Sequence, residues 1–243
     1  MKRDAFFIGW SWRSARPVAW LLAGVVVLLL GGMAGFGLAL GSGVDDPGDG
    51  HFVGDQTVTG VLLAEPYPVL VVGPDTAHPM GHALLLAGGA KVGVQSLAAP
   101  LAGRRVRVDG FAVKRGTIDM LLAWRMEPVE GDAPRPAEEA LGTWRLTGEI
   151  CDGKCYSGVM RPGAGLAHKA CANVCLLGGV PPVLVTTAPV AGASFLLLAD
   201  PQGHALPDEF RDHVAILQRM DGTVTRVADL LIFRTDVAAA LDP

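Results

Sequence analysis

An uncharged, apolar stretch near the N-terminus constrains this chain more than any other feature of its sequence. No charged residue occurs between residues 18 and 44, and residues 21–30 are leucine, valine and alanine apart from one glycine. A helix rises about 1.5 Å per residue, so roughly 20 apolar residues cross a hydrocarbon core about 30 Å thick. The stretch therefore predicts one transmembrane helix over residues 18–41.

The charges on the two sides of this stretch differ in sign. The basic residues before it are Lys2, Arg3, Arg13 and Arg16, and the first charged residues after it are Asp45, Asp46 and Asp49. Cationic flanks stay in the cytoplasm. We therefore expect residues 1–17 to be cytoplasmic, the helix to lie in a bacterial inner membrane, and the body to be periplasmic or extracellular.

A cleaved secretory signal is the alternative interpretation of the same stretch. The apolar core of a signal is usually about 7–15 residues long and ends at small residues. The apolar run here is longer, although residues 31–43 contain enough small residues for a cleavage site. Both interpretations place the body outside the cytoplasm.

The rest of the chain is typical of short strands and turns. With 32 glycines and 17 prolines, long helices are disfavoured. Residues 42–56 are rich in glycine and aspartate and predict a tether. Alternating and β-branched apolar segments predict a β-domain over 57–129 and a second over 143–243. Between them, residues 130–142 predict a linker.

The second β-domain repeats the apolar pattern of the first. The segments that correspond are 58–61 with 144–150, 68–71 with 182–185, 82–87 with 195–199, 106–109 with 214–217, and 121–125 with 230–234. Five short strands in each copy suggest a small barrel similar to the OB-fold. We therefore predict a mainly β protein, with a transmembrane helix and two OB-like barrels, of which the second carries a cysteine-rich helical insertion over 151–181.

All four cysteines lie in this insertion. The surrounding segment, 148–182, opens with Gly-Glu-Ile, contains two Cys-x-x-x-Cys pairs, has a histidine three residues before the third cysteine, and ends in Gly-Gly-x-Pro-Pro. It resembles a segment of uncharacterised bacterial membrane-anchored and exported proteins. The resemblance implies membership of that group and carries no assigned activity.

Disulfide bonds are the first interpretation of the cysteines, which are Cys151, Cys155, Cys171 and Cys175. An oxidising compartment and an even number of cysteines favour two structural disulfides. Residues 167–177 predict a helix that ends at two glycines. Cysteines four apart in a helix have Cβ atoms about 5–6 Å apart, whereas a disulfide needs about 3.8 Å. The first pair should therefore bond to the second, and each bond should contribute about 3 kcal/mol.

A metal or redox site is the alternative. His168 shares a helix face with Cys171 and Cys175. Together with Cys151 and Cys155, these residues suit zinc, and the nearby Met160 extends the alternative to copper(I). A cycling dithiol is a third interpretation, although the Cys-x-x-Cys motif is absent.

A second copper hypothesis concerns the segment His78-Pro-Met80-Gly-His82. Clustered histidine and methionine suit copper in an exported protein. Pro79 and Gly81 instead predict a turn whose histidines are exposed to solvent.

Other classes of function find no support in the sequence. A net charge of −4 and a pI near 5.8 disfavour nucleic acid as a partner. Nucleophile elbow, phosphate-binding loop and His-Glu-x-x-His motifs are absent. The sequence therefore predicts no catalytic residue and no resident cofactor.

The function predicted first is that of a non-catalytic accessory subunit of a membrane respiratory or redox complex. Its partners would be the membrane and other subunits of that complex. Gly31, Gly32 and Gly35 place small residues three and four apart, which permits close helix packing. A periplasmic protein that handles zinc, copper or thiols is the alternative.

Overall fold

The computed structural model describes residues 16–43 and 48–240. The first 15 residues, part of the predicted cytoplasmic segment, lie outside the described residues. Helix α1 (Arg16–Gly43) is long and apolar enough to cross a membrane, as an anchor or as a signal segment. It forms a unit separate from the body. Its Gly31, Gly32 and Gly35 have open space around them in the described part of the chain, so the helix-packing prediction stays a prediction.

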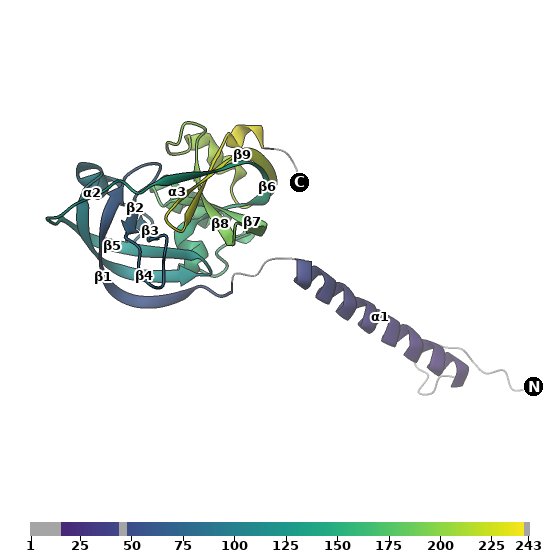
Figure 1. Cartoon of the computed structure of the whole chain (residues 1–243). Helices are drawn as coiled ribbons and strands as arrows, with labels where there is room; N and C mark the ends of the chain where they lie inside the picture. Colours follow the sequence, from purple (N-terminus) through teal and green to yellow (C-terminus); the bar gives the residue numbers. More distant parts are fainter. Residues whose placement is uncertain (1–15, 44–47, 241–243) are drawn as a thin grey trace, which may run out of the picture. The chain divides into compact units, whose positions relative to one another are not determined.

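The first half of the body is a closed five-stranded barrel (Figure 1). Its strands are β1 (His51–Leu63), β2 (Val69–Val72), β3 (His82–Ala87), β4 (Arg105–Arg115) and β5 (Ile118–Pro128). They follow the order β1-β2-β3-β5-β4 around the barrel, and β3 and β5 are parallel. Two short helical turns, α2 (Gln95–Ala98) and η1 (Ala99–Leu101), connect β3 to β4.

The second half is a barrel of the same topology. Its strands are β6 (Glu138–Asp152), β7 (Pro182–Val190), β8 (Ala193–Ala199), β9 (Leu217–Val227) and β10 (Leu230–Thr235). Their order is β6-β7-β8-β10-β9, with β8 and β10 parallel. The predicted fold class is confirmed: a mainly β chain with an N-terminal apolar helix and two small OB-like barrels.

The register of the parallel pairs corrects part of the predicted repeat. Leu86 pairs with Leu121, and its counterpart Leu198 pairs with Phe233. Residue 233 therefore corresponds to 121, whereas the sequence pattern had matched 230 to 121. Residues 214–216 precede β9 rather than opening it. The first error arises because β5 and β10 contain continuous apolar runs, which show no in–out alternation to set the register. The second arises because residues 214–216 are apolar and lie directly before β9.

Two predicted segment boundaries were also wrong. Residues 51–56, expected in the tether, belong to β1 and pair with β4 from His51 to Gln56. The predicted linker extended to residue 142, but β6 begins at Glu138 and pairs with β9. Glycine-rich and acidic composition predicted loops at these places. Hydrogen bonding to a long neighbouring strand extends the strands instead.

Three apolar clusters hold the body together. One fills each barrel, and a third contains residues of both barrels. In β3, Leu84 and Leu86 face the barrel interior, whereas Leu85 belongs to the shared cluster. Equivalent residues of the two barrels both belong to it: Leu85 and Leu197, Ile118 and Leu230, and Met120 and Ile232. This shared cluster explains why β3 and β8 are apolar on both faces.

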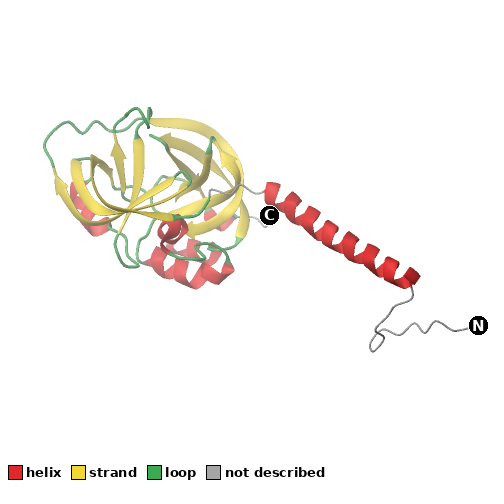
Figure 2. Ribbon diagram, turned by 90° about the horizontal axis from the view of Figure 1, so that it is seen from below, coloured by secondary structure: helices red, strands yellow, loops and turns green. Residues whose placement is uncertain are grey.

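The connection between β6 and β7 contains most of the helical structure of the second barrel. It holds the π-helical turn η2 (Cys155–Val159), the 3-10 turn η3 (Leu166–His168) and the helix α3 (Lys169–Leu177). The corresponding connection of the first barrel spans only the few residues between Leu63 and Val69. Figure 2 shows the helical segments at the edge of the strand-built body.

Candidate functional site

The longer connection brings three cysteines and a histidine together, and we call these four residues the thiol cluster: Cys155, His168, Cys171 and Cys175. The Sγ atoms of Cys155 and Cys175 are 4.0 Å apart. The ligand atoms of Cys155, His168 and Cys171 all lie within 4.8 Å of one another, and so do those of Asp152, Cys155 and Cys175. Cys171 is partly exposed, and the other three are buried.

Asp152, the last residue of β6, organises the cluster. Its side chain is fully buried. Its Oδ1 accepts a hydrogen bond from the backbone N–H of Cys155 at 2.8 Å, and its Oδ2 lies 3.0 Å from His168 Nε2. A histidine that binds a metal commonly donates its other N–H to a carboxylate. Asp152 is placed to orient His168 in this way.

Two lysines bring positive charge to the thiols. Lys91, in the loop after β3 of the first barrel, places its Nζ 2.8 Å from Cys171 Sγ. Lys154 is only 3% exposed. Its Nζ donates to the carbonyl oxygens of Gly88, Gly89 and Ala90, at 2.5, 2.8 and 2.6 Å. Burial lowers the pKa of Lys154. The cluster therefore lies where the insertion of the second barrel meets a loop of the first.

The contact between Cys155 and Cys175 shifts the pKa values of the two thiols in opposite directions. The hydrogen bond with Cys155 lowers the pKa of Cys175, and the charges of Lys91 and Lys154 act in the same direction. The pKa of Cys155 is raised by the same hydrogen bond and by burial. The two sulfurs lie 4.0 Å apart, and either thiol can be the donor in this contact. A bound metal ion would displace a thiol proton here, because the thiolate is the metal ligand.

Close backbone contact explains the glycines at the end of the insertion. The backbone N–H of Gly93 donates to the carbonyl of Gly178 at 2.7 Å. A Cβ at Gly178 would come within 2.0 Å of the Lys91 carbonyl oxygen, and one at Gly93 within 2.2 Å of the Gly179 carbonyl oxygen. Only glycine lets the two loops approach this closely. The Gly-Gly exit therefore holds the Lys91 loop against the thiol cluster.

Cys151 and Met160 stand apart from the cluster. Cys151 Sγ donates to Glu149 Oε1 at 3.3 Å, and burial raises the pKa of this thiol. Neither group of converging ligand atoms includes Cys151. Met160 is exposed. Of the five metal ligands proposed from the sequence, four belong to the two overlapping groups that share Cys155. The fifth, Cys151, instead contacts Glu149 on its own strand.

The structure does not contain the two predicted disulfides, since all four cysteines are free thiols. Cys151 lies against Glu149, and Cys171 contacts Lys91. Only the Cys155 and Cys175 sulfurs form a cysteine contact, at 4.0 Å against about 2.05 Å for a disulfide bond. The sequence correctly indicated a clustering of cysteines, but it carried no information on Lys91, Lys154 or Asp152 as their neighbours.

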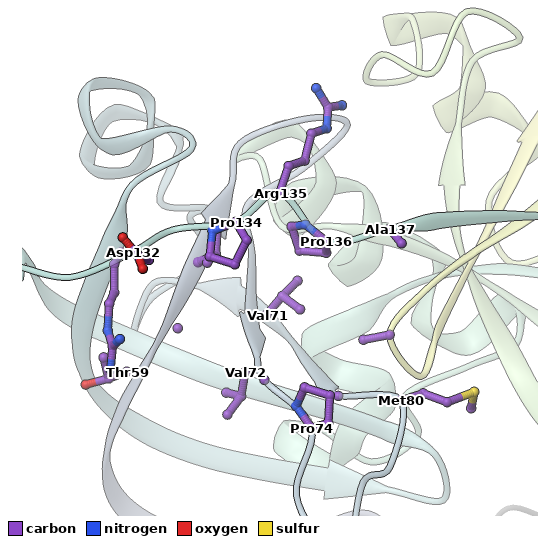
Figure 3. A pocket seen from close by; sticks show the side chains of 16 residues that line it. Thr59, Val71, Val72, Pro74, Met80, Asp132, Pro134, Arg135, Pro136 and Ala137 are labelled. Carbon is purple, nitrogen blue, oxygen red and sulfur yellow. The ribbon is translucent and has the colours of Figure 1, made fainter.

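A separate cavity of about 600 Å³ lies on the first barrel. Strands β1 and β2 form one side of it, and the chain between the barrels runs across another, with Pro134, Arg135 and Pro136 at its rim (Figure 3). Most of its lining is apolar, with Val71 and Val72 beneath. The thiol cluster contributes no residue to it.

Comparison with protein family models, with curated proteins and with solved structures found no match. The resemblance of segment 148–182 stays a prediction.

Proposed function

We propose that this protein binds a thiophilic metal ion, Zn²⁺ or Cu⁺, at the thiol cluster, and that α1 attaches it to a membrane. The observation that supports the proposal is a pair of overlapping ligand groups that share Cys155: its sulfur lies within 4.8 Å of the ligand atoms of His168 and Cys171, and also of those of Asp152 and Cys175. Three cysteines and one histidine form one of the ligand sets that hold zinc in a tetrahedral site. Copper(I) also prefers such soft ligands.

The charges around the cluster favour a bound divalent ion. Three thiolates and the Asp152 carboxylate carry four negative charges, and Lys91 and Lys154 supply two positive ones. A divalent ion brings this group to neutrality. Buried charges are costly unless they are paired or bind a metal. The positions of the two lysines thus suit a loaded site better than a site of three protonated thiols.

The proposal is tested by measuring metal content and affinity of the full chain in detergent. Purified protein should bind one Zn²⁺ per chain at the cluster in competition with a chromophoric chelator. Cys155→Ser and Cys175→Ser should lose this ion. Cys151→Ser is the matched control, because it removes a buried thiol outside the cluster, and it should keep the ion.

Two results would contradict the proposal. One is a wild-type protein with four titratable thiols and no binding of Zn²⁺ or Cu⁺. The other is an equal loss of metal in Cys151→Ser and Cys175→Ser, which would mean that a general loss of fold explains both.

The accessory role predicted from the sequence stays a proposal alongside this one. A metal-binding body on a single apolar helix suits a subunit of a membrane respiratory or redox complex. Purification from detergent-solubilised membranes tests it. Co-purification of oxidoreductase or cytochrome subunits would support the role, and recovery of a lone monomer would count against it.

A further inference from the structure

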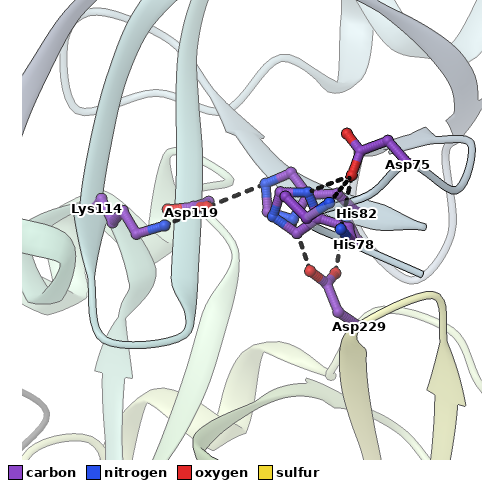
Figure 4. A network of polar contacts seen from close by, with 8 residues as sticks. Asp75, His78, His82, Lys114, Asp119 and Asp229 are labelled. Carbon is purple, nitrogen blue, oxygen red and sulfur yellow. Dashed lines mark hydrogen bonds and ion pairs between the residues drawn. The ribbon is translucent and has the colours of Figure 1, made fainter. Parts of the chain in front are cut away.

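A second cluster of metal-binding side chains lies between the two barrels, and we call it the His–Asp cluster: His78, His82, Asp119 and Asp229 (Figure 4). His82 opens β3, and its side chain is 16% exposed. Its Nδ1 lies 2.6 Å from Asp229 Oδ2, and its Nε2 lies 3.0 Å from Asp119 Oδ2. The ring of His78 stacks on that of His82 with centroids 4.2 Å apart.

Asp229 belongs to the second barrel, in the turn between β9 and β10. Its Oδ1 accepts a hydrogen bond from the backbone N–H of Ala83 in β3 at 2.7 Å. The side chain is therefore held in place against the first barrel. The turn predicted around residue 80 is present, and Met80 is exposed there. His82 is nevertheless covered by the other barrel, which the sequence did not indicate.

The geometry of three of these side chains suits a metal ion. The ligand atoms of His78, His82 and Asp229 lie within 4.8 Å of one another. Two ligands bound to one ion at about 2.0–2.1 Å with a tetrahedral angle are about 3.3 Å apart. Nδ1 of His82 and Oδ2 of Asp229 are 2.6 Å apart. A movement of less than about 1 Å therefore lets an ion replace this hydrogen bond.

Asp119 completes the arrangement from the other side of the ring. It lies on Nε2 of His82 and is held by Lys114 Nζ at 3.1 Å. Carboxylate, histidine and metal in line are the usual arrangement around a metal-binding histidine. The second oxygen of Asp119, Oδ1, is buried and has no hydrogen-bond partner within the described part of the chain. An unpaired buried acceptor is costly, so the burial of Asp119 indicates a carboxylate kept for its contacts with His82 and Lys114.

The surroundings provide both room and negative charge. A cavity of about 330 Å³ adjoins His78, His82, Asp119 and Asp229. Three carboxylates, those of Asp75, Asp119 and Asp229, stand against the single lysine Lys114. Arg226 also lines the cavity, but it is paired with Glu139 at 3.0 Å. The excess of negative charge favours a cation.

We propose that a divalent first-row transition ion binds between the barrels, held by His78, His82 and Asp229, with Asp119 orienting His82. Imidazole and carboxylate ligands suit Zn²⁺, Co²⁺ and Ni²⁺, whereas the thiol cluster prefers softer ions. Because Asp229 comes from the second barrel, the ion joins the two halves of the body. This site is independent of the thiol cluster and does not rest on the function proposed for it.

Cobalt(II) titration of the full chain in detergent distinguishes the two sites. Cobalt bound to thiolates gives a strong near-ultraviolet charge-transfer band, whereas cobalt bound to imidazole and carboxylate gives only visible d–d bands. We expect wild-type protein to bind an ion of the second kind. His78→Ala should weaken it at least about tenfold, as should Asp119→Asn through the orientation of His82. His204→Ala, which changes an exposed histidine beside Asp200, should leave it unchanged.

The outcomes of this titration separate the two proposals. If wild-type protein shows the visible d–d bands without the charge-transfer band, the result counts against the thiol cluster and leaves the His–Asp site standing. Equal visible-band titrations of wild type and His78→Ala would overturn the His–Asp site. His78 is partly exposed, so its replacement should not unfold the body, and an unchanged circular dichroism spectrum verifies this. Equal weakening in His204→Ala would also overturn the site.

Discussion

In the metal-free protein, His82 should make stability depend on pH. Burial alone would lower the pKa of His82, but the hydrogen bonds with Asp119 and Asp229 raise it to about 9. The same contact with His82, with the contribution of Lys114, lowers the pKa of Asp119 despite its burial. The raised pKa of His82 and the lowered pKa of Asp119 are the shifts expected for an imidazolium held between two carboxylates, one from each barrel.

The magnitude follows from the difference between the folded and unfolded pKa values of His82. A rise from 6.5 to about 9 is worth about 3 kcal/mol at about 1.4 kcal/mol per pH unit. Because the folded pKa is the higher one, the stabilisation is fully present below pH 6.5. It is lost as the pH rises through about 9.

Urea unfolding in the presence of a chelator measures this effect at several pH values. We expect the stability advantage of wild type over His82→Gln to fall by about 3 kcal/mol between about pH 6 and about pH 10. His204→Gln, which changes an exposed histidine, should follow the wild-type curve. A difference between wild type and His82→Gln that stays constant across this range would refute the reasoning.

Three further predictions concern the contact between the thiol cluster and the first barrel. Lys154→Met leaves the buried carbonyl oxygen of Gly88 and the partly buried ones of Gly89 and Ala90 without their donor, and should destabilise the fold by about 3 kcal/mol in urea unfolding. Lys169→Met, which removes a lysine whose hydrogen bond is exposed to solvent, should have little effect. Gly178→Ala places a Cβ within 2.0 Å of the Lys91 carbonyl oxygen and should lower the thermal midpoint, and Gly89→Ala, which has open space, should not. Lys91→Met removes a cation beside Cys171, so it should weaken zinc binding and raise the pH needed for binding. Competition with a chelator at several pH values measures both effects. Unchanged affinity would show that Lys91 does not act on the cluster.

The fold was predictable from the sequence because its signals are local. An uninterrupted apolar stretch indicates a spanning helix, and two sets of five short apolar segments indicate two barrels. Register was not predictable where local alternation fails. Met120 and Ile232 are as apolar as Leu121 and Phe233 beside them, because they are buried in the cluster that the two barrels share. An interface between domains therefore removes the pattern from which register is deduced.

The residues of the candidate sites likewise fall into those that local sequence indicates and those that only the pairing of the barrels brings in. Cys155, Cys171 and Cys175 were recognisable by residue type and spacing. Lys91 and Asp229 were not, because each acts on a residue of the opposite barrel, far away in the sequence. Cys151 shows the reverse error: its spacing made it a ligand, but strand geometry directs it to Glu149.

Both polar clusters depend on the pairing of the barrels. Equivalent apolar residues supply the shared core, so the interface itself follows the duplication. The polar residues of the two clusters, in contrast, are not equivalent between the barrels. The second barrel supplies all ligands of the thiol cluster, but the first supplies Lys91 and the carbonyls that bind Lys154. In the His–Asp cluster the roles are exchanged, since the first barrel supplies both histidines and the second supplies Asp229. The first barrel alone lacks Asp229, and the second alone lacks the lysine and the carbonyl contacts that surround its thiols. This gives a physical reason for keeping two copies of one fold in a single body.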